Sequence, residues 1–190
     1  DPDRETGDAW VRRTIHTFVN RNKRSMTLNM KAPEGQAVFR KLAAGADVLV
    51  EGFRPGVMKR LGADYVTLHQ LNPQLVYCSL SGFGQDGPYR DRPAHDMNYL
   101  SLAGVLNLIG EKDRKPAIPL NLVADFGGGG MLLALGVVSG VLAARSSGCG
   151  QVVDAAMVDG VALLMAPFFM ALRSGYFSNE RGTNLLDSGA

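Results

Sequence analysis

The sequence lacks several features that would place it in a special class of protein. Cysteine occurs only at Cys78 and Cys149, and these two positions give neither a disulfide framework nor a metal-binding or redox spacing. Lys and Arg nearly balance Asp and Glu, for a formal net charge of +2, and no basic run alternates with aromatic residues. Nucleic acid is therefore not an expected partner, and a reducing compartment is the expected environment.

The first residues also lack the pattern of a targeting signal. D-P-D-R-E-T-G-D contains no initiating Met, no basic segment and no apolar segment, so neither a secretory nor a transit signal is predicted. The final residues, 180–190, form a loop-like stretch without a closing helix or strand. We therefore expect residues 1–190 to be the central part of a longer protein whose N- and C-terminal segments are absent.

What is present is a succession of strand and helix patterns. Hydrophobic residues make up 46% of the chain, enough for a sizeable core. Residues 25–30 alternate polar and apolar side chains, as does a strand with one buried face. Pro33 suits the first turn of a helix that Gly45 ends as a left-handed cap, and residues 47–51 form a short apolar run of strand length. This order predicts a βαβ unit and a parallel sheet.

The unit then repeats. Residues 57–62 and 65–71 have helical patterns, and residues 75–80 and 151–157 have the apolar runs of buried strands. The predicted fold class is therefore α/β, with a Rossmann-like parallel sheet and flanking helices. Glycine-rich turns follow two of the predicted strands, where α/β proteins bind ligands, so both turns are candidate ligand loops; simple tight turns are the alternative.

His95 is a candidate acid–base residue. It lies just before residues 97–108, which carry a helical stripe of apolar side chains. The positive end of a helix dipole disfavours an imidazolium, so a histidine there is suited to accept a proton. A surface histidine that merely caps the helix is the alternative.

Asp125 is the second candidate. It precedes the four glycines of residues 127–130 and an uncharged apolar run, residues 131–144. This run has the composition of a membrane span, but the glycines weaken such a helix, so a buried, tightly packed helix is expected instead. Asp125 then acts either in proton transfer or as the cap of that helix. Asp154 and Asp159 are expected only to bond backbone groups.

Seven ordered motifs run from Asn20 to the end of the chain. They are N-R-N-K-R-S, D-V-L-V-E-G-F-R-P-G-V, L-V-Y-C-S-L-S-G-F-G-Q-D-G-P, H-D-M-N-Y-L, P-L-N-L-V-A-D-F-G-G-G-G, G-Q-V-V-D-A-A-M-V-D-G and R-G-T-N-L-L-D-S-G-A. These motifs resemble those of the α-methylacyl-CoA racemases, which belong to the class III CoA-transferase (CaiB/BaiF) family. The resemblance implies that residues 1–190 are the central part of the large domain of that family's fold.

The resemblance implies a role for individual residues. The histidine of H-D-M-N-Y-L and the aspartate of D-F-G-G-G-G correspond to the racemases' two acid–base groups, here His95 and Asp125. It also implies an interlocked homodimer, and an N-terminal nucleotide contact and a histidine-pairing glutamate that this chain lacks. The family's contacts with CoA map onto Leu28, Lys31, Gly52, Phe53, Arg54, Arg60, Asp96 and Tyr99.

The implied reaction inverts C2 of a 2-methylacyl-CoA thioester, which needs proton removal on one face and proton return on the other. Backbone N–H groups at the glycine-rich helix start near Asp125 are expected to stabilise the enolate, and Lys31, Arg54 and Arg60 to bind the CoA phosphates. This acid–base chemistry needs no metal or redox cofactor, so none is expected, and coenzyme A enters as part of the substrate. No membrane partner is expected. The implied location is the cytoplasm in a bacterium, or mitochondria or peroxisomes in a eukaryote.

Two other functions stay open. In a class III CoA-transferase the same aspartate attacks the thioester as a nucleophile and forms a mixed anhydride. The family's transferases usually carry tyrosine or another non-basic residue at the position of His95, which favours the racemase. A non-catalytic, CoA-binding fragment is the other alternative.

Overall fold

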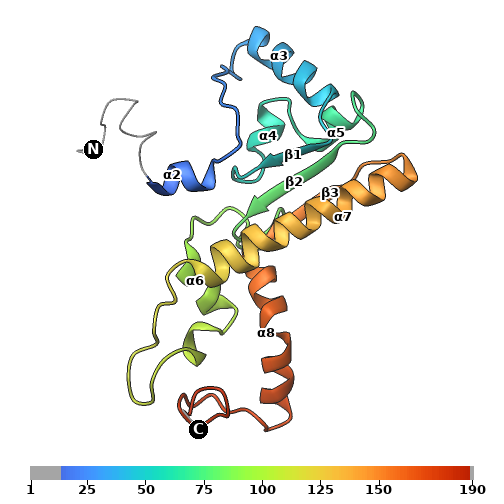
Figure 1. Cartoon of the computed structure of the whole chain (residues 1–190). Coiled ribbons are helices and arrows are strands. Elements are labelled where there is room, and N and C mark those ends of the chain that lie inside the picture. Colours follow the sequence, from blue (N-terminus) through green and yellow to red (C-terminus); the bar gives the residue numbers. More distant parts are fainter. Residues whose placement is uncertain (1–13, 189–190) are drawn as a thin grey trace, which may run out of the picture.

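The computed structural model describes residues 14–188, so the first residues, for which no leader signal was predicted, lie outside the described part. Three parallel strands form its centre: β1 (Val48–Glu51), β2 (Val76–Ser81) and β3 (Val152–Ala156), in the order β1-β2-β3 (Figure 1). Val48 is paired with Val76, and Tyr77 with Val152. The predicted parallel sheet is confirmed.

Helices join these strands. The helices before β2 are α2 (Thr14–Val19), α3 (Pro33–Ala44), α4 (Val57–Arg60) and α5 (Tyr65–His69). Between β2 and β3 lie α6 (Asp96–Leu102), the 3-10 turn η1 (Leu106–Leu108), the π-helix η2 (Leu122–Met131) and α7 (Leu132–Ser147); α8 (Met157–Arg173) follows β3.

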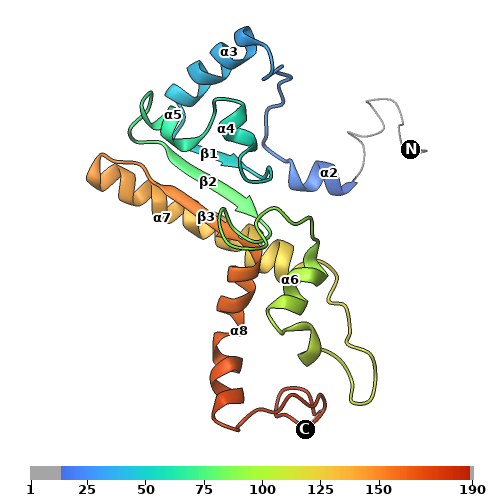
Figure 2. The same ribbon diagram turned by 180° about the vertical axis from the view of Figure 1, so that it is seen from behind.

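The central strand β2 is covered on both faces (Figures 1 and 2). Leu75, which precedes it, and Tyr77 form one core cluster with residues of α3 and α5. Val76 and Cys78, which point the other way because side chains alternate along a strand, pack with Ala144 of α7. Burying each large apolar side chain contributes about 1.5–3 kcal/mol, so this strand anchors the fold.

Helix α7 presents one face to the sheet and leaves the other uncovered. A Cβ on Gly136 would lie 2.7 Å from Val153 Cγ1, so the glycine permits close packing. On the opposite face Val138 is 67% exposed and Leu142 is 70% exposed. The expectation of a buried helix is therefore right for one face only. The continuous helix Leu122–Ser147 is long and apolar enough to cross a membrane by length and composition.

Three local predictions are wrong. Residues 25–30 do not form a strand, because no strand of residues 14–188 lies beside them to complete a ladder. Gly45 ends α3 at φ −107°, outside the left-handed region, with its N–H bonded to Leu42. The helix predicted over residues 97–108 stops at Leu102, because Gly104 adopts φ +77° and turns the chain.

Candidate functional site

The two glycine-rich turns lie at the same edge of the sheet, since β1 and β2 are parallel. In the first turn the N–H of Phe53 donates to the Oε2 of Glu51 at 2.8 Å. In the second, the N–H of Gly84 donates to Ser81 Oγ at 3.0 Å and the N–H of Gln85 donates to Asp154 Oδ2 at 2.9 Å. Asp154 therefore bonds a backbone amide, as predicted, although the amide belongs to a distant turn.

A cavity of about 450 Å³ opens between these turns and the N-terminal end of α6. It brings together five of the ten residues that the sequence singles out, and both glycine-rich turns line it; ligand binding by these turns stays a prediction. These five are Gly52, Phe53, Arg54, His95 and Tyr99.

The cavity wall is cationic. Arg54, Arg90 and Arg92 line it, and none of the lining residues is an aspartate or glutamate. The Nε of Arg90 donates to Asp91 Oδ2 at 3.3 Å, but both side chains are exposed, so this pair contributes little. Such a wall suits an anionic ligand.

The sequence analysis missed Arg90 and Arg92. Both lie in the segment that follows the second glycine-rich turn and leads directly to His95. Their place between a strand-end turn and a candidate base was the available signal, because residues there face the edge where α/β proteins bind ligands.

His95 is the residue at the start of α6, as predicted. Its backbone N–H donates to Asn98 Oδ1 at 2.9 Å, and the N–H of Asn98 donates to the His95 carbonyl oxygen at 2.9 Å. This pair of bonds holds the first turn of α6. The histidine is exposed and lines the cavity, so its imidazole is accessible to a ligand.

Asp125 lies inside the π-helix η2 and is half-buried. It does not cap α7, which begins seven residues later at Leu132, so the structural alternative predicted for it is wrong. π-Helical turns are rare and are frequent at functional sites. Asp125 is not among the residues that line the cavity.

Tyr99 lines the cavity and lies near Asp125. Burial raises the pKa of the Tyr99 hydroxyl above its ordinary value, and the negative charges of Asp125 and Asp96 raise it further. The hydroxyl donates to the Ala94 carbonyl oxygen at 2.9 Å, and a Cβ on Gly82 would overlap the ring. The Tyr99 ring is thus a fixed part of the cavity wall, close to both carboxylates.

Asp96 links α6 to η2. It is 6% exposed, and its Oδ2 accepts the N–H of Ala124 at 2.9 Å and the N–H of Asp125 at 2.8 Å. The N–H of Phe126 donates to the Asn121 carbonyl oxygen. The prediction that backbone amides around Asp125 stabilise an enolate is therefore wrong for these three amides, because each already has an acceptor.

The structure does not bring Leu28, Lys31 or Arg60 into this cavity. Leu28 and Lys31 belong to the unpaired segment before α3, and Lys31 is exposed. Arg60 is exposed at the end of α4, with its guanidinium beside Gly56. Their contacts with CoA stay a prediction, as does the contact of Asp96.

Within residues 14–188 no three His, Cys, Asp or Glu side chains are grouped as a metal site. The prediction that the reaction needs neither a metal nor a redox cofactor is a statement about chemistry, and it stays a prediction.

Comparisons with known proteins agree on one family for this chain. The profile of CoA-transferase family III matches residues 1–188, including the first nineteen, in which the sequence analysis found no likeness. The chain is 46% identical to α-methylacyl-CoA racemase of Mus musculus over 177 residues, 93% of this chain and 46% of that protein. It is 42% identical to an acyl-CoA transferase of Fusarium pseudograminearum (strain CS3096) over 141 residues, 74% of this chain and 31% of that protein.

A solved crystal structure supports the same family. The crystal structure of a CaiB/BaiF family protein from Brucella suis superposes with a TM-score of 0.78 at 36% identity, over 85% of this chain and 43% of that chain. The chain spans less than half the length of each of these relatives.

Proposed function

The chain belongs to CoA-transferase family III, and from this membership and the site we propose that the full-length protein is a racemase of 2-methylacyl-CoA thioesters. The observation that carries the proposal is the link through Asp96, which ties the helix that carries His95 to the helix that carries Asp125. Two proton carriers on different elements suit a reaction with two faces. The similarity to a protein named α-methylacyl-CoA racemase supports the same choice.

In the proposed reaction one of the two groups removes the proton from C2, and the C–H electron pair moves into the enolate of the thioester. The other group then delivers a proton to the opposite face of C2. The exchange balances without any other reactant, since the substrate loses and regains one proton. The thioester acidifies the α-proton, so a histidine and a carboxylate suffice as the acid–base pair.

A CoA-transferase is the second candidate, and the similarity to the Fusarium transferase is the observation that favours it. There the carboxylate of Asp125 would attack the thioester carbonyl, CoA thiolate would leave, and a mixed anhydride would form. The exposed His95 on the cavity wall has no role in that attack, which is why we prefer the racemase.

Solvent exchange separates the two candidates. The full-length protein in D₂O is expected to introduce deuterium at C2 of a 2-methylacyl-CoA without any acceptor acid, because deprotonation is part of racemisation. Mass spectrometry and ¹H NMR of the recovered thioester measure this. Absence of deuterium, together with an Asp125 anhydride that hydroxylamine intercepts, would instead establish the transferase. A non-catalytic protein would show neither, although acyl-CoA would still raise its melting temperature.

The arginines of the cavity wall give a second prediction. Replacing Arg54, Arg90 or Arg92 by alanine in the full-length protein should raise the KM for acyl-CoA by roughly 10-fold or more, because a hydrogen bond to a charged group contributes about 1.5–3 kcal/mol. Lys31→Ala should do the same if the family's contact holds. The loss should shrink at high salt, since the contact is ionic.

Arg114→Ala is the matched control, because Arg114 is exposed and does not line the cavity. Among residues 14–188 its side chain has only a 3.9 Å pair with Glu111, and its carbonyl oxygen, which accepts from Arg181, is kept in alanine. Steady-state kinetics at two salt concentrations test the set. If all the arginine variants keep the wild-type KM, the anion does not bind at this wall.

We further propose that the full-length protein acts as an interlocked homodimer on acyl-CoA in lipid metabolism, as the resemblance implies. Analytical ultracentrifugation of the full-length protein would show whether it is a dimer.

A further inference from the structure

We propose that Asp96 is a positioning residue, whose buried carboxylate holds the backbone of Asp125 in place against the helix that carries His95. The acid–base roles of His95 and Asp125 rest on the proposed function. The positioning of the Asp125 backbone rests only on contacts between α6 and η2. Asp96 follows His95 directly in the sequence, so one residue connects the two candidate acid–base groups.

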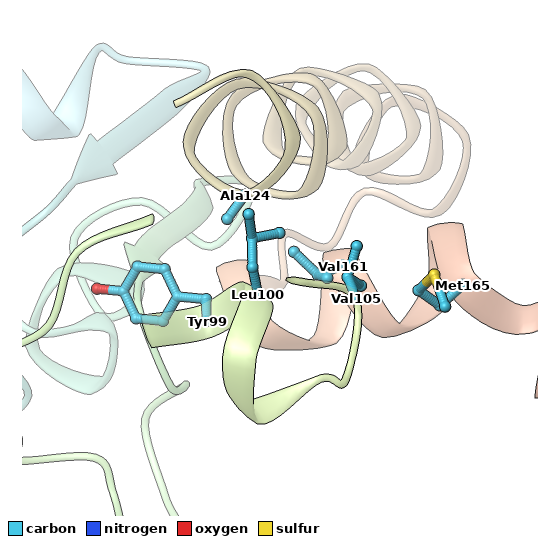
Figure 3. Close-up of a cluster of buried hydrophobic side chains, with 6 residues drawn as sticks. All are labelled: Tyr99, Leu100, Val105, Ala124, Val161 and Met165. Atoms are coloured by element: carbon cyan, nitrogen blue, oxygen red, sulfur yellow. The ribbon is translucent and has the colours of Figure 1, made fainter. Parts of the chain in front are cut away.

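The contacts of Asp96 are specific. One carboxylate oxygen, Oδ2, accepts two successive amides of η2, from Ala124 at 2.9 Å and from Asp125 at 2.8 Å. Amides at the start of a helix have no partner within it, so an external carboxylate satisfies them and lies favourably at the positive end of the helix dipole. The apolar neighbours close the contact: Leu100 of α6 packs beneath Ala124 in the same core cluster (Figure 3).

Among residues 14–188, few other hydrogen bonds hold the start of η2. Leu120, just before it, has φ +57°, a left-handed conformation that is uncommon for a leucine, and its side chain is exposed. The other bonds here are longer: the N–H of Leu122 lies 3.4 Å from the Pro119 oxygen, and the N–H of Phe126 lies 3.3 Å from the Asn121 oxygen. The two bonds to Asp96 are therefore the shortest hydrogen bonds at this end, and they add to the packing of Ala124.

The other end of η2 is fixed against α8. A Cβ on Gly128 would lie 2.8 Å from the Val161 nitrogen, and a Cβ on Gly160 would overlap the Gly128 carbonyl oxygen, so the two backbones are in direct contact. Asp125 lies between this contact and Asp96. Its backbone is thus held from both sides, and removal of Asp96 frees one of them.

The second carboxylate oxygen of Asp96 makes the proposal testable. Oδ1 is buried and has no hydrogen-bond partner among the described residues. In Asp96→Asn, the amide oxygen can accept both η2 amides, while the NH₂ takes the place of an oxygen that bonds nothing here. Positioning therefore survives in Asp96→Asn and is lost in Asp96→Ala. A bond that Oδ1 accepts from an N–H of the CoA moiety would be lost in both, because an NH₂ group cannot accept it.

Hydrogen exchange tests the inference without reference to activity. In the full-length protein, the amides of Ala124 and Asp125 are expected to exchange at least about 10-fold faster in Asp96→Ala than in the wild type, and at the wild-type rate in Asp96→Asn. Asp86→Ala, an exposed aspartate in the turn after β2, is the control. Unchanged protection of both amides in Asp96→Ala would overturn the proposal.

Kinetics of the same variants test the consequence. Asp96→Ala should lower kcat by about 100-fold with little change in KM, because a displacement of about 1 Å can cost that much, and Asp96→Asn should restore kcat. If Asp96→Ala does not fold, Asp96→Glu serves instead, since its extra methylene displaces the acceptor oxygen. A raised KM in Asp96→Asn would show a CoA contact and refute positioning alone. A wild type without racemase activity would refute the proposed function and leave the exchange result standing.

Discussion

Replacing His95 by alanine in the full-length protein is expected to lower racemisation of a 2-methylacyl-CoA by about 10²–10⁴-fold, the contribution typical of one general acid–base group. The residue is exposed on the cavity wall, so its removal leaves no buried gap and the protein should stay folded. Polarimetry of a single enantiomer measures the rate, and thermal unfolding checks the fold.

Asp125→Asn should be equally damaging for a different reason. The amide keeps the size of the side chain, and the backbone N–H of residue 125 can still donate to Asp96, but the amide cannot accept the proton. Asp86→Asn, in the exposed turn, is the matched control and should retain wild-type activity. An Asp125→Asn protein within a few-fold of the wild-type rate would remove Asp125 from the reaction.

The His95→Ala protein also discriminates between the two candidate functions. A racemase that has lost one of its two proton carriers should fail to invert its substrate. A transferase that uses only Asp125 as the nucleophile should still move CoA between acids in that variant. Continued transfer by His95→Ala, without deuterium exchange by the wild type, would overturn the racemase proposal.

The largest effect on stability is expected from Gly160→Ala. The new methyl group would overlap the carbonyl oxygen of Gly128 and lie against its backbone, which cannot move aside as a flexible side chain can. Forced overpacking of this kind typically costs 1–3 kcal/mol, and backbone contact places this case at about 3 kcal/mol or more. Urea denaturation of the full-length protein measures the loss.

Gly130→Ala is the matched control from the same pair of helices. Its Cβ would lie 3.5 Å from the Asp125 carbonyl oxygen, an ordinary contact. Alanine also has a better helix propensity than glycine, by about 1 kcal/mol, so stability should be unchanged or slightly raised. If Gly160→Ala is as stable as Gly130→Ala, then η2 and α8 do not touch as described.

Much of the fold could be predicted from local patterns. The apolar runs before the two glycine-rich turns became β1 and β2, and residues 151–157 supplied β3. Glycine and proline gave the breaks between them, because these residues restrict or extend the allowed backbone angles. His95 at the start of α6 also followed from sequence, since the apolar stripe after it has helical spacing.

Two of the errors share a physical cause, which is a partner elsewhere in the chain. Residues 25–30 alternate like a strand, but a strand needs a neighbour, and no strand of residues 14–188 lies beside them. The region around Asp125 looked like the start of an α-helix, yet it forms a π-helix whose first amides bond to Asp96. A local sequence pattern indicates which secondary structure a segment can form, but it does not show which distant segment will pack or hydrogen-bond with it.

By itself, the sequence determined the parallel α/β architecture, the position of His95 at a helix start and the resemblance to a CoA-transferase family. These features depend on side-chain period, on glycine and proline, and on ordered motifs, all of which are local. Only the tertiary structure decided that Arg90 and Arg92 share a cavity with His95, and that Asp96 bonds the backbone of Asp125. The bond between Asp96 and the Asp125 backbone forms where α6 and η2 bury Leu100 and Ala124 against each other, since packing between distant segments fixes which polar groups can meet.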